Sequence, residues 1–216
     1  MKVYEDYAWD GYTSIYSDQI INGMKDEQFI VDKAKLVEGK IEWNGDNMHS
    51  NMVYIYEKIA QFKPESVFEG GFGGGQNLFS IQKLFPDAKV GGVELLESQL
   101  EFGIQHFNMP REFFTERPCY FADFSIPHIA ARVTESFDLV YTNAVIMHLN
   151  SAKAINFLAN LIYMKPKYMV LVEGVARSFD EHEWPTYFEQ TKMLDYYNDI
   201  SDDICPMAKV LVRKDL

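Results

Sequence analysis

The residues best able to do chemistry are two acids and a run of glycines within SVFEGGFGGGQNLFSIQKLFPDAKVGGVEL, at positions 66–95. Glu69 is followed by Gly71, Gly73 and Gly75, so the backbone can turn sharply and pass close beneath a flat ligand. Glu94 follows Gly75 by nineteen positions, which predicts a place at the end of the neighbouring strand. A carboxylate there can accept hydrogen bonds from both hydroxyls of a ribose.

Two phosphate-binding glycine loops are alternatives to this interpretation. A dinucleotide fingerprint needs a third glycine where Gln76 stands, and a P-loop needs a lysine and a hydroxyl residue where the chain has Gln76 and Asn77. A diphosphate would also meet the carboxylate of Glu69, whereas an ammonium and a sulfonium would be attracted to it. The pattern therefore predicts a pocket for S-adenosylmethionine rather than a flexible glycine turn.

The elements that must position these residues follow from the hydrophobic pattern. Short apolar runs separated by helical segments predict strands at 66–69, 89–94, 119–122, 137–143, 168–173 and 208–213. Such alternation predicts an α/β, Rossmann-like, doubly wound sheet that is mostly parallel and seven-stranded. The last run, with a short strand near 194–197, predicts an antiparallel C-terminal hairpin.

Four motifs, in order, resemble those of class I S-adenosylmethionine-dependent methyltransferases: VFEGGFGGGQNL, GGVELLES, FADF at 121–124 and FDLVYTNAVIMHL at 137–149. The resemblance implies that Glu69 lies near the methionine moiety, Glu94 binds the ribose and Asp123 meets the adenine amino group. The remaining implied cofactor contacts are Gly71, Gly73, Gly75, Phe124 and Asn143. More narrowly, the segments GDNMHSNM and VIMHLN are similar to segments of the small methylases associated with nonulosonic acid and other sugar biosynthesis.

Several side chains are candidates for the base that a hydroxyl acceptor needs. His148 follows the fourth predicted strand and is placed at the rim of the cleft; Glu173 ends the fifth strand, and His182 follows it. A structural role for His148 and helix capping for Asp123 are the alternatives.

The segment from Thr142 to Val145 departs from the proline-rich pattern of methyltransferases that act on nucleobases or glutamine amides. The acidic residues that bind the metal in magnesium-dependent relatives are not evident in the sequence either. We therefore expect no metal.

The acceptor is expected to contact residues near 179–188, FDEHEWPTYF, whose acid and aromatic side chains suit a polar or cationic small molecule. Glu183, Trp184 and Tyr187 are the candidates there, and a charged helix start is the alternative interpretation. His49 is a further candidate, with packing at the start of a helix over 47–62 as its alternative.

Composition bounds the class of protein. The 216 residues are 47% apolar, which is enough for one buried domain, and we expect a helical, aromatic cap at 1–45 ahead of a methyltransferase domain at 46–216. A helical pattern is expected over 18–35.

The net charge of −12 opposes binding to nucleic acid. With two cysteines, no signal-peptide pattern and no membrane-span pattern, the sequence predicts a cytoplasmic protein with no membrane contact.

The sequence thus predicts methyl transfer from S-adenosylmethionine to a small molecule, at oxygen on a sugar or secondary-metabolite intermediate. Two alternatives stay open at this point. One is an N-methyltransferase of a peptide or amino acid, and the other is a non-catalytic, cofactor-binding subunit. A homodimer is compatible with the sequence.

Overall fold

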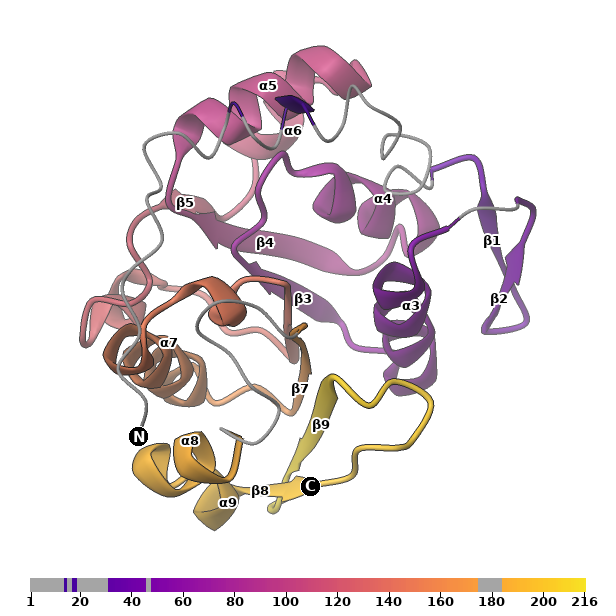
Figure 1. The fold of residues 1–216 in the computed structure, drawn as a ribbon. Helices are drawn as coiled ribbons and strands as arrows, with labels where there is room; N and C mark the ends of the chain where they lie inside the picture. Colours follow the sequence, from indigo (N-terminus) through magenta and orange to yellow (C-terminus); the bar gives the residue numbers. More distant parts are fainter. Residues whose placement is uncertain (1–13, 15–16, 19–30, 46–47, 175–183) are drawn as a thin grey trace.

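A computed structural model describes residues 14, 17–18, 31–45, 48–174 and 184–216. Most of the expected N-terminal cap, together with His182 and Glu183, lies outside these ranges. Within them, a central sheet is covered by helices on both faces (Figure 1).

The central sheet has the order β5-β4-β3-β6-β7-β9-β8. The chain forms β3 to β7 as parallel strands, whereas β9 runs antiparallel to both β7 and β8. This topology confirms the predicted doubly wound, mostly parallel sheet with an antiparallel C-terminal hairpin. The strands are β3 Ser66–Gly70, β4 Lys89–Glu94, β5 Cys119–Phe121, β6 Leu139–Asn143, β7 Tyr168–Val172, β8 Tyr197–Asp199 and β9 Ala208–Arg213.

Two hydrophobic clusters form because successive strand residues point to opposite faces. Val67 packs into one cluster with α3 (Ser50–Phe62), α4 (Gln76–Leu84) and α5 (Glu97–Phe107), while Phe68 packs into the other with α7 (Ser151–Tyr163) and α8 (Trp184–Thr191). Four further helical elements are short: α6 Arg111–Thr115, η3 Ile129–Arg132, η4 Ile146–His148 and α9 Met193–Tyr196.

The expected helical pattern over 18–35 is wrong at its end. Ala34–Val37 forms β1, which pairs in an antiparallel hairpin with β2, Lys40–Trp43. The two turn residues, Glu38 and Gly39, both have positive φ, at 51° and 78°. A two-residue turn of this kind has a backbone twist that matches the right-handed twist of the strands on either side. The hairpin lies beside α3 (Figure 1). The Trp43 ring of β2 meets the Tyr56 ring of α3 edge-on, at a centroid distance of 6.4 Å.

Strand order reverses at β3, because the chain leaves it for β4 on one side and returns to β6 on the other. The loops after these strands separate at that point, and open α/β sheets bind ligands in the resulting crevice. None of the described helices is long and apolar enough to cross a membrane.

Candidate functional site

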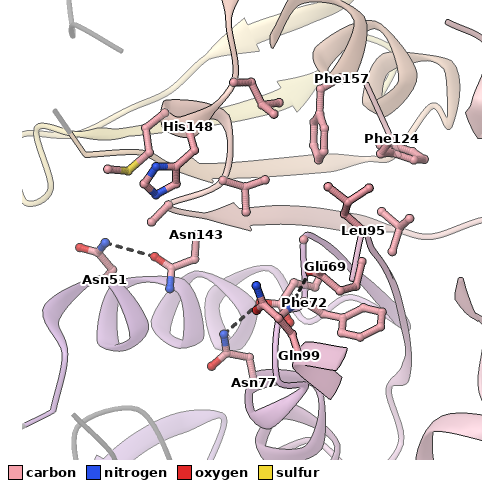
Figure 2. A pocket seen from close by; sticks show the side chains of 18 of the residues that line it. Asn51, Glu69, Phe72, Asn77, Leu95, Gln99, Phe124, Asn143, His148 and Phe157 are labelled. Carbon is pink, nitrogen blue, oxygen red and sulfur yellow. Dashed lines mark hydrogen bonds between the residues drawn. The ribbon is translucent and has the colours of Figure 1, made fainter. Parts of the chain in front are cut away.

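A cavity of about 590 Å³ opens at the carboxyl ends of β3, β4, β5 and β6. This volume is typical of a small-molecule site. In Figure 2, His148, Asn143 and Asn51 lie at one end, and Leu95, Phe124, Phe72 and Gln99 lie toward the other. The two ends of the cavity therefore differ in chemistry, since one is polar and the other is largely apolar.

The loop after β3 is fixed against β4 and against the loop that follows β6. The backbone N–H groups of Gly71 and Phe72 both donate to the carbonyl of Val93, at 2.7 and 3.1 Å. Gly71 has φ of +78°, and a Cβ there would lie 2.5 Å from Val145 Cγ2. Glycine is needed at this position both for the backbone conformation and for the close contact with the loop that follows β6.

Gly103 supports the same loop from α5. A Cβ on Gly103 would lie 2.0 Å from the carbonyl oxygen of Gly74, so a larger residue would have to displace the loop backbone. The predicted Gly73 and Gly75 also have positive φ, and Gly75 is the N-cap of α4. Gly71 and Gly73 line the cavity.

Glu94 ends β4 and connects the glycine loop to the start of α5. Its Oε2 accepts a hydrogen bond from the Gly73 N–H at 2.8 Å, and its Oε1 accepts one from the Leu96 N–H at 2.9 Å. Burial raises the pKa of this carboxyl, and the backbone donors oppose the rise. Because each carboxylate oxygen has two acceptor sites, Glu94 can still accept hydrogen bonds from a ligand.

Glu69, in β3, is 1% exposed and lines the same cavity. Its Oε1 accepts a hydrogen bond from Asn77 Nδ2 at 2.9 Å (Figure 2). Burial raises the pKa of Glu69 to about 8, against the opposing effect of Asn77 and the neighbouring Tyr141 hydroxyl. Tyr141 is the register partner of Glu69 on β6, so both side chains lie on one face of the sheet.

The loop after β5 brings Asp123 and Phe124 to the cavity. Asp123 Oδ1 accepts a hydrogen bond from the Ser125 N–H at 2.9 Å, which fixes the turn and leaves the other oxygen available. Phe124 packs edge-on against Phe157, with ring centroids 5.2 Å apart. These rings and the exposed Leu95 form an apolar wall suited to a flat heterocycle.

The other end of the cavity is formed by the start of α3 and the loop after β6. Asn51 Nδ2 donates to Asn143 Oδ1 at 3.1 Å (Figure 2), and His49 Nδ1 accepts from the Asn51 N–H at 3.3 Å as the helix N-cap. His148 lines this end as well. His49 is therefore placed at the start of α3, as its alternative interpretation expected, although its side chain also borders the cavity.

Glu173 lies beneath this loop and does not line the cavity. It is 1% exposed, and its carboxylate accepts hydrogen bonds from Thr142 Oγ1 at 2.6 Å and from the Met147 N–H at 3.0 Å. Burial raises its pKa to about 7, and these donors oppose the rise. The contacts support a role in holding the loop that carries His148.

Trp184 and Tyr187 are not brought to the cavity. They are residues of α8, 2% and 0% exposed, and pack within the second hydrophobic cluster. Their expected contact with the acceptor stays a prediction. Among the described residues there is no cluster of three or more metal-ligating side chains.

Residues that the sequence interpretation missed include Asn51, Asn77, Gln99, Gly103 and Phe157. Asn77 follows Glu69 by eight positions, and only the turn of the glycine loop brings the two together. Gln99 and Phe157 sit on helices whose apolar pattern gave no sign of a cavity. Asn51 alone had a signal, since it belongs to the polar GDNMHSNM segment that drew attention to His49.

The described fold matches solved methyltransferase structures at low sequence identity. The methyltransferase domain of bacterial CtHen1 matches with a TM-score of 0.57 and 15% identity, covering 76% of this chain and 97% of that one. Magnesium protoporphyrin IX methyltransferase (ChlM) from Synechocystis PCC 6803 matches with a TM-score of 0.50 and 14% identity, covering 94% and 97%. StiE O-MT matches with a TM-score of 0.54 and 14% identity, covering 72% and 53%.

No protein-family model and no curated protein sequence matches the chain. At 14 to 15% identity the structural matches establish the fold. That fold is the Rossmann-like fold of class I S-adenosylmethionine-dependent methyltransferases.

Proposed function

We propose that the chain is a methyltransferase that transfers a methyl group from S-adenosylmethionine to a small metabolite, at an oxygen atom. The observation that carries this proposal is the grouping of three acids at the ends of three adjacent strands. Glu69, Glu94 and Asp123 all line one cavity, next to the glycine loop. No lysine or arginine is among the described residues that line it, so the cavity favours a cationic ligand over a phosphate.

The residues present fit this cofactor. Glu94, already fixed by Gly73 and Leu96, has acceptor sites left for the ribose hydroxyls. Asp123 and the Phe124 wall would hold the adenine, and Glu69 would meet the charged amino-acid end. When bound, the cofactor would supply a methyl group on a positively charged sulfur, and the neutral thioether S-adenosylhomocysteine would be the leaving group. The chain then accelerates transfer chiefly by aligning the two reactants, which is worth roughly 7–11 kcal/mol in well-oriented systems.

The far end of the cavity would hold the acceptor, with His148 taking the proton of its hydroxyl group. The Asn51–Asn143 amide pair offers further polar atoms on this side. A base is needed for a hydroxyl, whereas an amine can react without one. The imidazole at this end therefore favours oxygen as the acceptor atom.

Charge and structural similarity both favour a small acceptor. The net charge of −12 opposes a nucleic-acid backbone. StiE O-MT and the mitomycin 7-O-methyltransferase MmcR share the fold with TM-scores of 0.54 and 0.53, although this chain covers only 53% and 52% of them. N-methylation of a peptide or amino acid, and cofactor binding without catalysis, are the competing functions.

The acceptor can be identified by incubating the protein with methyl-labelled S-adenosylmethionine and a metabolite extract, followed by mass spectrometry. We expect a labelled O-methylated small molecule. Glu97→Ala is a matched control, because Glu97 is exposed and does not line the cavity, and it should label the same product. A labelled peptide would favour the N-methyltransferase, and cofactor binding without any product would favour the non-catalytic function.

A further inference from the structure

The carboxylate of Glu173 joins β6 to the loop that carries His148. Its Oε1 accepts a hydrogen bond from Thr142 Oγ1 in β6 at 2.6 Å, and its Oε2 accepts one from the Met147 N–H at 3.0 Å. Met147 is the middle residue of η4, and the N–H groups of the two residues before it also hold down the pKa of Glu173. The carboxylate therefore caps the short turn that ends in His148.

The backbone of this loop needs such support. Ala144, its first residue, has φ of +56°, in the left-handed region that is unfavourable for a residue with a Cβ atom. Backbone of this kind persists only where surrounding contacts fix it. The Ala144 N–H donates to the Val172 carbonyl at 2.8 Å, which holds the start of the loop. Glu173 holds the far end, because Met147 directly precedes His148.

Glu173 cannot act on the acceptor directly, since it is 1% exposed and does not line the cavity. We propose that Glu173 is a positioning residue, whose carboxylate bridges β6 and the following loop and thereby sets the place of the His148 imidazole in the cavity. The inference rests on the proposed function, in which His148 takes the proton of the acceptor's hydroxyl group. A displaced base aligns poorly with that proton, so the bridge acts on the rate of transfer.

Two substitutions separate the length of the side chain from its charge. Glu173→Asp keeps the carboxylate but is one methylene shorter, so it cannot reach both Thr142 and Met147 from the same backbone position. Glu173→Gln keeps the length, since its amide oxygen can accept from the Met147 N–H while its amide nitrogen donates to the Thr142 hydroxyl oxygen.

Turnover is measured as label transferred from methyl-labelled S-adenosylmethionine to the product formed in a metabolite extract. We expect Glu173→Asp to lower turnover about tenfold to a hundredfold, because a misplacement of about 1 Å can cost a hundredfold. Glu173→Gln should lower it by less than about threefold, because the bridge stays intact. The Gln variant thus restores what the shorter, charged side chain loses.

A double-mutant cycle with His148→Ala tests whether Glu173 acts through His148. If Glu173 only positions the imidazole, Glu173→Asp should lower turnover by less than about twofold once the imidazole is gone. A general weakening of the fold would lower turnover by the same factor in both backgrounds. Affinity of Glu173→Asp for S-adenosylhomocysteine should stay within about twofold of wild type, since Glu173 does not line the cavity.

Ser66→Ala is the matched control. Ser66 is buried at the start of β3, at the end of the sheet away from the cavity, and its Oγ accepts from the Asp138 N–H at 2.9 Å. The variant loses a hydrogen bond between a buried side chain and a backbone N–H, as Glu173→Asp does. Its melting temperature should fall, but its turnover should equal that of wild type.

Amide hydrogen exchange in the protein without ligand gives a readout that does not depend on methyl transfer. Exchange of the Met147 N–H should be about tenfold faster or more in Glu173→Asp, the effect of losing one charge-assisted hydrogen bond. In Ser66→Ala the exchange rate of this N–H should equal that of wild type.

The outcomes distinguish this inference from the proposed function. Equal losses of turnover in the two backgrounds, or the same Met147 exchange rate in wild type and Glu173→Asp, would overturn the inference and leave methyl transfer standing. A loss in Glu173→Gln as large as that in Glu173→Asp would also overturn it, because charge rather than reach would then matter. Binding of S-adenosylhomocysteine without any labelled product from wild type would overturn the proposed function and the inference together.

Discussion

His148→Ala is expected to lower methyl transfer by about 100- to 10,000-fold, the usual contribution of a positioned general base. His148 lines the end of the cavity formed by the loop after β6, away from Leu95 and Phe124 (Figure 2). Affinity for S-adenosylhomocysteine should barely change, since those acids are untouched. Steady-state kinetics together with calorimetry on the same preparation measures both quantities.

The control is His128→Asn. His128 is exposed and does not line the cavity, and asparagine tolerates its left-handed backbone, with φ of 63°. This variant should keep wild-type turnover. If His148→Ala has the wild-type melting temperature and retains most of its turnover, His148 is structural, and the proton must leave the acceptor by another route.

Glu94→Ala should weaken binding of S-adenosylhomocysteine by about tenfold to a hundredfold, because charge-assisted hydrogen bonds contribute roughly 1.5–3 kcal/mol. The substitution also leaves the Gly73 and Leu96 N–H groups without their acceptor, which loosens the loop around the ligand. Calorimetry against the Glu97→Ala control measures the loss. An unchanged affinity would remove Glu94 from the site.

The sequence predicted the features that depend on local pattern. Apolar runs located six strands of the sheet within two residues, because a sheet buried on both faces needs near-continuous apolar segments. The short strand expected near 194–197 was wrong in position: Met193–Tyr196 forms α9, and β8 follows at Tyr197–Asp199. The acids at strand ends were equally readable, since parallel strands bring their carboxyl ends to one edge. Glu69, Glu94 and Asp123 accordingly meet at one cavity.

What the sequence could not predict depends on contacts between distant segments. The role of Glu173 follows from its contacts with Thr142 and Met147, which place it under a loop rather than in the cavity. The burial of Trp184 and Tyr187 follows from the packing of α8 on the second cluster. The close approach of Gly103 to Gly74 joins a helix to a loop that lies 29 positions earlier in the chain.

The central claim is that this cavity binds S-adenosylmethionine, and ligand-induced stabilisation tests it most directly. At about 100 times its dissociation constant, S-adenosylhomocysteine should stabilise the folded protein by roughly 2.7 kcal/mol, seen as a higher melting temperature. NAD and ATP should give no shift, because their phosphates would face the acids at the strand ends. A larger shift with NAD or ATP than with S-adenosylhomocysteine would contradict the assignment.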